Sequence, residues 1–212
     1  MSVRPRGRPR SFDADTALAR ASERFRTQGL AGTSLDDLSE ATGLARPSLA
    51  AAFGDKRALY IAAIERLTGR VEAQLLRLAE LDLPPVALVE RLLIGGIDLY
   101  LTGADGPEGC LIINTAATAA AGDAQVRERL TAFLAMEDAR IAELLAAAGS
   151  PAPDAHGRIV ASVLHSLSVR ARAGEPREAL VAIARDTAAV IGAWRPGETA
   201  MSLGSGPKAG RR

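Results

Sequence analysis

The sequence predicts an all-α fold of about nine helices, in which a small N-terminal unit of three helices precedes a larger helical body. Alanine and leucine recur at three- and four-residue steps, which is the period of a helix buried on one face. Aromatic residues make up only 3% of the chain, and no stretch shows the sustained alternation of β-branched residues that is typical of strands. Prolines and capping residues separate the apolar stretches and divide them into successive helices.

The overall composition is that of a globular protein, with 48% apolar residues, 24% charged residues and a net charge of +1. The N-terminus is rich in arginine and proline, and no apolar run approaches the roughly 18 residues that a membrane helix needs. One cysteine and two distant histidines exclude an internal disulfide and a Cys/His zinc site. We therefore expect a cytoplasmic protein that needs neither a metal nor another cofactor.

Residues 13–58 are expected to form the three N-terminal helices. The first covers about 13–28 and ends at Gly29, a residue that favours a C-terminal cap. Thr33 or Ser34 caps the second helix, and Ser34 stands three residues before an aspartate, the spacing of a capping box. Leu35 and Leu38 are expected to form the buried face of this short helix.

A tight turn at 41–44 joins the second helix to the third, and Gly43 can adopt a positive φ there without strain. Pro47 suits the first turn of the third helix, where its missing N–H is not needed. Leu49 and Phe53, four residues apart, point this helix toward the core. The pattern is that of a helix-turn-helix, and the outward face of its third helix consists of Arg46, Ser48, Ala50 and Ala51, with Ala52 at one edge.

Six further helices are predicted after the helix-turn-helix, and residues 59–194 are assigned to one domain. Their positions follow from prolines, from Asp55 as an N-terminal cap and from apolar stripes at helical spacing. The last stretch, 195–212, is rich in Gly, Ser and Pro, and we expect it to be a flexible tail. The expected helix ranges are about 55–81, 85–102, 110–121, 123–148, 154–173 and 176–194, with a glycine-rich loop at 103–109.

Residues 33–59, TSLDDLSEATGLARPSLAAAFGDKRAL, resemble the DNA-binding signature of the TetR/AcrR family of transcriptional regulators. The shorter segment 109–116, GCLIINTA, is similar to a segment in one branch of that family. The resemblance implies a ligand-responsive repressor that binds a palindromic operator in double-stranded DNA as a homodimer. The features that carry it are the capped leucine-rich helix, Gly43-Leu44, Ser48-Leu49, Phe53, and Lys56 with Leu59.

Two positions of the third helix depart from the family pattern. The family commonly has Tyr at the position of Ala50, where it typically contacts a backbone phosphate, and His at the position of Ala52. An alternative reading is therefore a ligand- or protein-binding helical dimer whose DNA-binding head is degenerate. An enzyme is disfavoured, because the sequence has no glycine-rich phosphate loop, nucleophile elbow or paired catalytic carboxylates.

The third helix is expected to enter the major groove of DNA and to present its N-terminal residues to the base edges. Arg46 is the candidate for guanine, whose O6 and N7 match a guanidinium fork, and Ala51 for a thymine methyl group. The alternatives are that Arg46 and Lys56 are solvated surface charges and that Ser34 is only a cap. The resemblance implies that Thr33, Ser34 and Lys56 contact phosphate. The other predicted DNA contacts on the third helix are Pro47, Ser48 and Ala50.

The basic arm at residues 1–12 carries Arg4, Arg6, Arg8 and Arg10 before the first acidic residue. Its Pro-Arg-Gly-Arg-Pro core resembles an AT-hook, in which arginines flanking a glycine enter a narrow A·T minor groove. The alternative is a basic leader that contributes only salt-dependent attraction to DNA. Both readings predict that the arm adds affinity.

By resemblance, the middle helices form a chamber for an unknown small-molecule effector. Cys110 and Asn114 are polar candidates, but a buried structural thiol and a buried amide that satisfies local backbone are the alternatives. A redox-sensing Cys110 is a third reading, because a helix N-terminus lowers the pKa of an exposed thiol. The other candidates that line the chamber are Leu75, Leu93, Ile97, Tyr100, Leu111 and Phe133.

The last two helices, 154–173 and 176–194, are expected to form the homodimer interface. Their apolar stripes, with small Ala171, Ala184 and Ala188, can pack against the same pair from a second subunit as a four-helix bundle. The alternative is that these stripes are buried only within one subunit.

Overall fold

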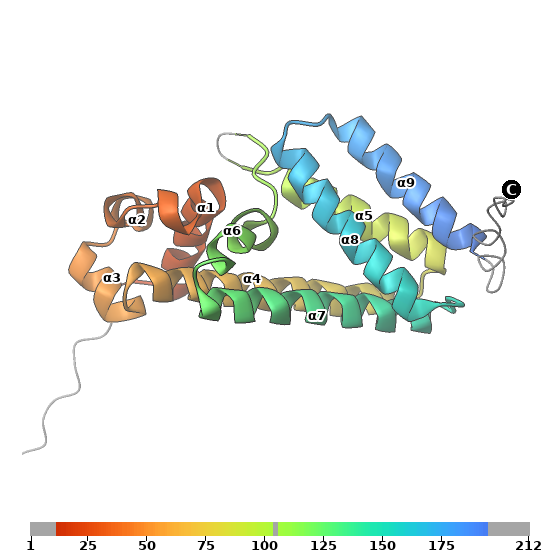
Figure 1. The fold of residues 1–212 in the computed structure, drawn as a ribbon, viewed down its shortest axis with the longest axis horizontal. Coiled ribbons are helices and arrows are strands. Elements are labelled where there is room, and N and C mark those ends of the chain that lie inside the picture. Colours follow the sequence, from red (N-terminus) through yellow and green to blue (C-terminus); the bar gives the residue numbers. More distant parts are fainter. Residues whose placement is uncertain (1–11, 104–105, 195–212) are drawn as a thin grey trace, which may run out of the picture.

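The computed structural model describes residues 12–103 and 106–194, and in this part of the chain every regular element is helical (Figure 1). The predicted all-α class is confirmed. The basic arm up to residue 11 and the predicted tail at 195–212 lie outside the described residues. The α-helices are α1 (Ala14–Gly32), α2 (Leu35–Thr42), α3 (Arg46–Phe53), α4 (Lys56–Leu78), α5 (Pro85–Tyr100), α6 (Ala117–Ala120), α7 (Ala124–Ala147), α8 (Pro153–Arg172) and α9 (Arg177–Ala193).

Side-chain caps and prolines set the beginnings of these helices. Asp13, Ser34, Asp55 and Asp123 each accept a hydrogen bond from a backbone N–H in the first turn of the helix that follows. Prolines occupy the first turns of α3, α5 and α8, where a missing N–H costs nothing. These local signals explain why the predicted helix ranges agree closely with the observed ones.

Two segments differ from regular α-helix. Gly29 interrupts α1 with φ 70° and ψ 177°, so the predicted end there is a break, after which the helix resumes up to Gly32. The predicted helix at 110–121 is instead a π-helical turn, η2 (Ile112–Ala116), followed by α6. The wider turn accompanies a side-chain bond from the Asn114 amide to Ser168 Oγ on α8, 3.1 Å away.

The helices form an elongated molecule with a small head at one end (Figure 1). Helices α1, α2 and α3 make up the head, α4 and α7 run side by side along the length, and α5, α8 and α9 pack together at the other end. The apolar core is continuous from head to body, and the Phe25 and Tyr60 rings meet edge to face across it at 5.0 Å. No helix in the described ranges has the length and hydropathy needed to cross a membrane.

Candidate DNA-binding face and central cavity

The second helix of the head begins with the predicted capping box. Ser34 Oγ accepts a hydrogen bond from the Asp37 N–H at 3.1 Å, and Asp37 Oδ2 accepts one from the Ser34 N–H at 2.8 Å. Bonds from Ser34, together with nearby Arg24, lower the pKa of Asp37. Gly43 ends the helix with φ 70°, the left-handed conformation that the predicted tight turn requires.

The third helix presents the outward face that the sequence predicts. Leu49 is buried in the core, whereas Ser48, Ala50 and Ala51 are exposed together with Arg46 and Pro47. Apart from Arg46 and Ser48, this face is made of apolar or small side chains. Side-chain hydrogen bonds from this face of α3 can therefore come only from one guanidinium and one hydroxyl group.

The expected burial of Leu35 is wrong. Its side chain is 42% exposed, while Leu38 and Thr42 form the buried side of α2. Because α2 has only two turns, its inward stripe is a single pair four residues apart, and Leu35 in the first turn lies beside it. Phe53 is partly buried and packs against the core.

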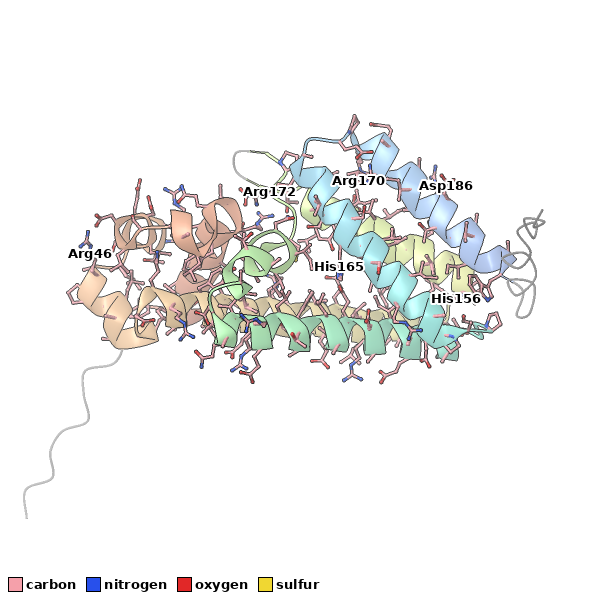
Figure 2. The ribbon with its side chains drawn as sticks, in the orientation of Figure 1. Arg46, His156, His165, Arg170, Arg172 and Asp186 are labelled. Atoms are coloured by element: carbon pink, nitrogen blue, oxygen red, sulfur yellow. The ribbon has the colours of Figure 1, made fainter. Side chains whose placement is uncertain are left out.

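Arg46 forms an ion pair with Asp36 of α2, and its Nε donates to Asp36 Oδ1 at 2.8 Å. Both side chains are more than half exposed, so the pair lies at the surface of the head. Figure 2 shows Arg46 at the end of the molecule farthest from α9. The guanidinium is thus accessible, although a carboxylate of its own chain holds it in this structure.

Two of the predicted phosphate contacts bind each other. Lys56 Nζ donates to the Thr33 carbonyl oxygen at 2.8 Å, which ties the beginning of α4 to the beginning of α2. The Thr33 hydroxyl donates to the Gly29 carbonyl oxygen at 2.7 Å and is buried, so the side chain does not face solvent as a phosphate contact would require. Ser34 is exposed, and its hydroxyl belongs to the capping box.

A cavity of about 570 Å³ lies in the body, bounded by α1, α4, α5, η2, α7 and α8. Its volume is within the range of small-molecule sites. Five of the eight predicted effector contacts line it: Leu75, Tyr100, Cys110, Leu111 and Phe133.

The other three predicted contacts do not line this cavity. Leu93 and Ile97 are fully buried in the apolar core. They belong to the side of α5 that packs on other helices, and an apolar stripe does not reveal which of its residues meets a cavity. The Asn114 amide donates to Ser168 Oγ at 3.1 Å and is directed to the Glu108 carbonyl at 3.4 Å, so it satisfies local groups.

The cavity also has a charged group that the sequence reasoning missed. Glu137 is only 4% exposed and lines the cavity, and its Oε2 lies 2.6 Å from Nε2 of His165 on α8. It follows the predicted contact Phe133 by four residues on α7, so both share one face of the helix. That spacing is the signal that could have identified it.

Burial raises the pKa of the Cys110 thiol to about 11, although backbone N–H groups of Ile113 and Ile112 partly offset the effect. The thiol is therefore protonated at neutral pH, and only a thiolate is a good nucleophile. This environment opposes the redox-sensing interpretation. The backbone N–H of Cys110 donates to Ser168 Oγ at 2.8 Å, which fits a structural position.

A cluster of charged side chains joins the head to the cavity wall. Arg26 of α1 lies 3.0 Å from Glu108 and donates to the Thr102 carbonyl oxygen at 2.8 Å. Arg172, near the carboxyl end of α8 in Figure 2, donates to the carbonyl oxygens of Arg26 at 2.7 Å and Thr27 at 2.8 Å. The end of α1 is therefore held by groups from α8 and from the segment that precedes η2.

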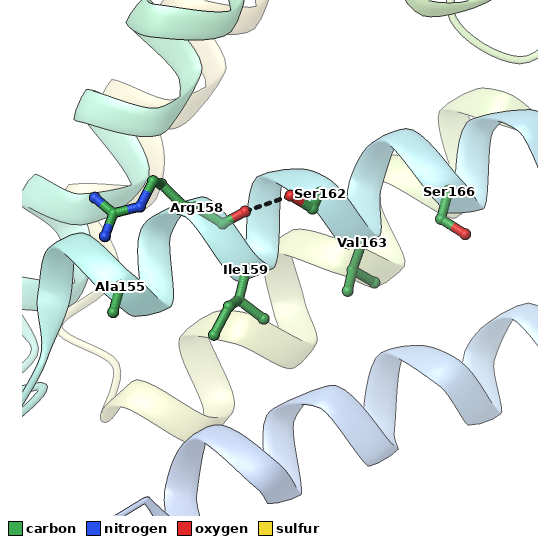
Figure 3. A pocket seen from close by; sticks show the side chains of 6 residues that line it. All are labelled: Ala155, Arg158, Ile159, Ser162, Val163 and Ser166. Atoms are coloured by element: carbon green, nitrogen blue, oxygen red, sulfur yellow. Dashed lines mark hydrogen bonds between the residues drawn. The ribbon is translucent and has the colours of Figure 1, made fainter. Parts of the chain in front are cut away.

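The outer surface of α8 carries a shallow groove of about 460 Å³ (Figure 3). Ile159 and Val163 form its apolar part, and small side chains flank them. Val190 of α9 is 60% exposed. Ala171, Ala184 and Ala188 are buried within the subunit, so the prediction that they permit close approach of a second subunit is wrong. The residues that line the groove are Ala155, Arg158, Ile159, Ser162, Val163 and Ser166.

The comparisons with known proteins agree on one group of relatives. The family model "Bacterial regulatory proteins, tetR family" matches residues 17–63. The HTH-type transcriptional repressor ComR of Escherichia coli is 33% identical over 193 residues, which cover 86% of this chain and 90% of ComR. The E. coli repressor BdcR is 25% identical over 178 residues, which cover 84% of this chain and 88% of BdcR.

A solved structure shares the fold over nearly the whole chain. It holds a cysteine mutant of the TetR family transcriptional regulator CifR, complexed with a double-strand operator DNA of 26 base pairs. The sequence identity is 31% and the TM-score is 0.76, and the match covers 89% of this chain and 100% of the CifR chain. The likeness therefore extends beyond the head into the helices that form the cavity.

Proposed function

Because this chain belongs to the TetR family of bacterial regulatory proteins, we propose that it is a transcriptional repressor that binds double-stranded operator DNA. The exposed outward face of α3 is the observation that supports this function for the chain itself. Arg46 reads a guanine, and phosphate contacts at Ser34 and Lys56 fix the register of the head on the duplex. The regulators of this family act by binding DNA and are not enzymes.

The protein binds a palindromic operator as a homodimer, because one helix-turn-helix covers too few base pairs for a specific site. The groove on α8 and exposed Val190 on α9 support an interface through these helices. The β-branched and small side chains of the groove allow two copies of α8 to approach closely around a two-fold axis. Sedimentation at micromolar concentration tests this, and a strict monomer would exclude it.

The central cavity binds a small-molecule effector that changes the affinity of the dimer for DNA. Leu75, Leu111 and Phe133 supply apolar wall, and Tyr100 and Cys110 supply polar atoms. The linkage requires an effector that binds one arrangement of the two heads better than the other. The contacts of Arg26 and Arg172 connect the cavity wall to the head.

Mapping of the bound sites across the genome of the source organism, followed by binding assays on those sites, tests the DNA function. We expect Arg46→Ala to weaken binding to the mapped operator by roughly tenfold or more, because a bidentate contact to guanine is lost. Arg91→Ala is the matched control, since Arg91 is an exposed arginine on α5, far along the chain from α3.

The second candidate function is a ligand- or protein-binding dimer with a degenerate head. The alanines at positions 50 and 52 favour it, because they remove two side chains that the family commonly uses on this helix. Absence of any specific site at physiological salt would support this second function and reject the repressor. A specific site that is lost in Arg46→Ala and kept in Arg91→Ala would reject the second function.

A further inference from the structure

The central cavity contains a buried carboxylate with one oxygen free for a ligand. Glu137 is 4% exposed, and His165 engages its Oε2 at 2.6 Å. Among the described residues, no group forms a hydrogen bond to its other oxygen, Oε1. Oε1 keeps some accessible surface and is therefore an acceptor that a hydrogen-bond donor inside the cavity could reach.

Tyr100 places a second polar group in the same cavity. Its side chain is 6% exposed, and within the described ranges its hydroxyl has no hydrogen-bond partner. Burial raises the pKa of Tyr100 well above its usual value, and repulsion from Cys110, once that thiol is ionised, and from Glu137 acts in the same direction. The group is therefore a neutral phenol that can both donate and accept a hydrogen bond.

The rest of the cavity disfavours a cation and favours an apolar body. Leu75, Leu92 and Phe133 contribute apolar wall. Arg66, Arg70 and Arg77 line it from α4, where their spacing places them along one side of the helix. Arg66 is engaged by Asp15, but no ion pair involves Arg70 or Arg77 in the described part of the chain. A cationic ligand would have to pass these guanidinium groups.

We propose that the cavity binds an uncharged amphipathic alcohol or phenol. Its hydroxyl group donates to Glu137 Oε1 and accepts from the Tyr100 hydroxyl, and its apolar body lies along Leu75 and Phe133. His165 positions the carboxylate through its other oxygen, Oε2. This assignment rests on the proposed function, in which the same cavity is the effector site, and it adds the chemical class of the effector.

Three probes with one alkyl body test the class on the full-length protein by titration calorimetry. They are 1-octanol, octanoate and octylamine, which are neutral, anionic and cationic at neutral pH. We expect 1-octanol to bind at least tenfold more tightly than the other two. Tighter binding of octanoate would overturn the proposal in favour of a site governed by the arginines, and tighter binding of octylamine would overturn it in favour of a simple anionic site.

Substitutions locate the hydroxyl contacts. Tyr100→Phe removes one hydroxyl and keeps the ring, and we expect it to weaken 1-octanol binding about tenfold, the effect of one good hydrogen bond. Tyr60→Phe is the matched control, because the Tyr60 hydroxyl bonds to Thr115 Oγ1 at 2.7 Å and Tyr60 does not line the cavity. Glu137→Gln is expected to weaken binding by a similar factor, since it replaces a charged acceptor by a neutral one.

A variant whose cavity is filled by a larger side chain tests whether 1-octanol binds in the cavity or elsewhere on the protein. A Cβ at Gly95 would meet only Gln74 Nε2, at 4.0 Å, so Gly95→Leu extends a side chain into the cavity from a helix that tolerates leucine. We expect it to abolish 1-octanol binding. Unchanged binding in Gly95→Leu, or no difference between Tyr100→Phe and Tyr60→Phe, would overturn the proposal. Operator binding by the ligand-free protein is measured separately, and its loss or retention decides only the proposed function.

Discussion

At the scale of single residues, the ion pair of Arg46 and Asp36 decides how much of the recognition helix is free for DNA. The pair is exposed, and exposed pairs are weak, so the proposed contact of Arg46 with a guanine would break it at small cost. The carboxylate remains after that exchange, on a surface that must approach phosphates. In the proposed complex with DNA, Asp36 therefore opposes binding in two ways, because it holds Arg46 and repels the phosphates of the duplex.

We expect Asp36→Asn to raise operator affinity several-fold at low salt. The amide keeps the size of the side chain and removes the charge that competes with the phosphates. Fluorescence anisotropy with a labelled operator measures the change over a range of salt concentrations. Glu40→Gln, at an exposed acidic position later in α2, is the control. Equal affinities of Asp36→Asn and the natural protein would show that the ion pair does not restrain Arg46.

His156 makes the stability of the body depend on pH. It is fully buried at the start of α8, where Nδ1 lies 2.6 Å from Ser150 Oγ and the ring meets Trp194 edge to face at 5.1 Å. Burial lowers the pKa of His156, so the folded state favours the neutral ring. The unfolded state binds the proton more readily, and stability is therefore complete above the unfolded pKa of about 6.5 and is lost as pH falls below it.

The expected result is a pH-dependent difference between the natural protein and His156→Asn. The substitution removes the titrating ring, so the advantage of the natural protein in Tm should be larger at pH 7.5 than at pH 5. Thermal unfolding at several pH values measures it, with His165→Asn as the control for the other histidine. A constant difference across this range would mean that His156 does not gain its proton on unfolding.

At the scale of elements, the adjacent glycines Gly95 and Gly96 of α5 differ in how much space a side chain would have. A Cβ at Gly96 would lie 2.6 Å from Leu164 Cδ2 of α8, whereas a Cβ at Gly95 would meet only the end of Gln74. Gly96 therefore permits the close contact between α5 and α8, and Gly95 leaves the cavity open.

We expect Gly96→Ala to be less stable than Gly95→Ala by about 1–3 kcal/mol, because the added methyl group must displace the packed Leu164 side chain of α8. Gly95→Ala is the matched variant and should be neutral or stabilising by up to about 1 kcal/mol, since alanine favours a helix more than glycine. Urea unfolding measures both. Equal effects of the two substitutions would contradict the packing argument.

The helices themselves could be predicted because their signals are local. Ser34 with Asp37, Gly43 and Pro47 each act within one turn, and each stands in the structure where the pattern placed it. Their packing partners could not be predicted in the same way. Leu35 shares the residue type and helical spacing of Leu38, yet it is exposed, because a two-turn helix buries a narrower stripe than its apolar residues suggest.

The residues that line the cavity could not be predicted from the sequence for the same reason. Periodicity places a residue on a face of its helix, but whether that face meets a packed neighbour or empty space depends on how several helices are arranged. Leu93 and Ile97 meet packed neighbours, whereas Leu75 and Phe133 meet the cavity. Glu137 was missed because it is one of four acidic residues on α7, and acidic residues on a helix are usually solvated.

At the scale of the whole molecule, Arg172 links the end of the head to the last helices. Its guanidinium reaches two carbonyl oxygens at the end of α1, and it connects that end to α8. Arg170, two residues earlier on the same helix, pairs with Glu175 and forms no hydrogen bond or ion pair with the described residues of α1. Comparing variants of the two arginines therefore distinguishes the effect of a contact with α1 from the effect of a local ion pair.

We expect Arg172→Ala to speed hydrogen exchange of the backbone amides at the end of α1, because two carbonyl contacts that fix this segment are removed. Arg170→Ala should leave the same amides unchanged. Hydrogen exchange followed by mass spectrometry on both variants measures the effect. Similar protection in the two variants would mean that Arg172 does not hold the head on the body.

The length of α4 converts a small tilt at one end of the helix into a larger displacement at the other end. Its 23 residues rise about 34 Å, from Lys56 beside the DNA-binding turn to the leucines of the cavity wall. A rigid rod of that length acts as a lever, and a tilt of about 5° at the cavity end displaces the other end by roughly 3 Å. In a symmetric dimer the two displacements oppose each other, so the recognition helices shift by about twice that amount relative to half-sites about 34 Å apart. In the proposed dimer, an effector that tilts α4 at the cavity would thus take both heads out of register with their half-sites.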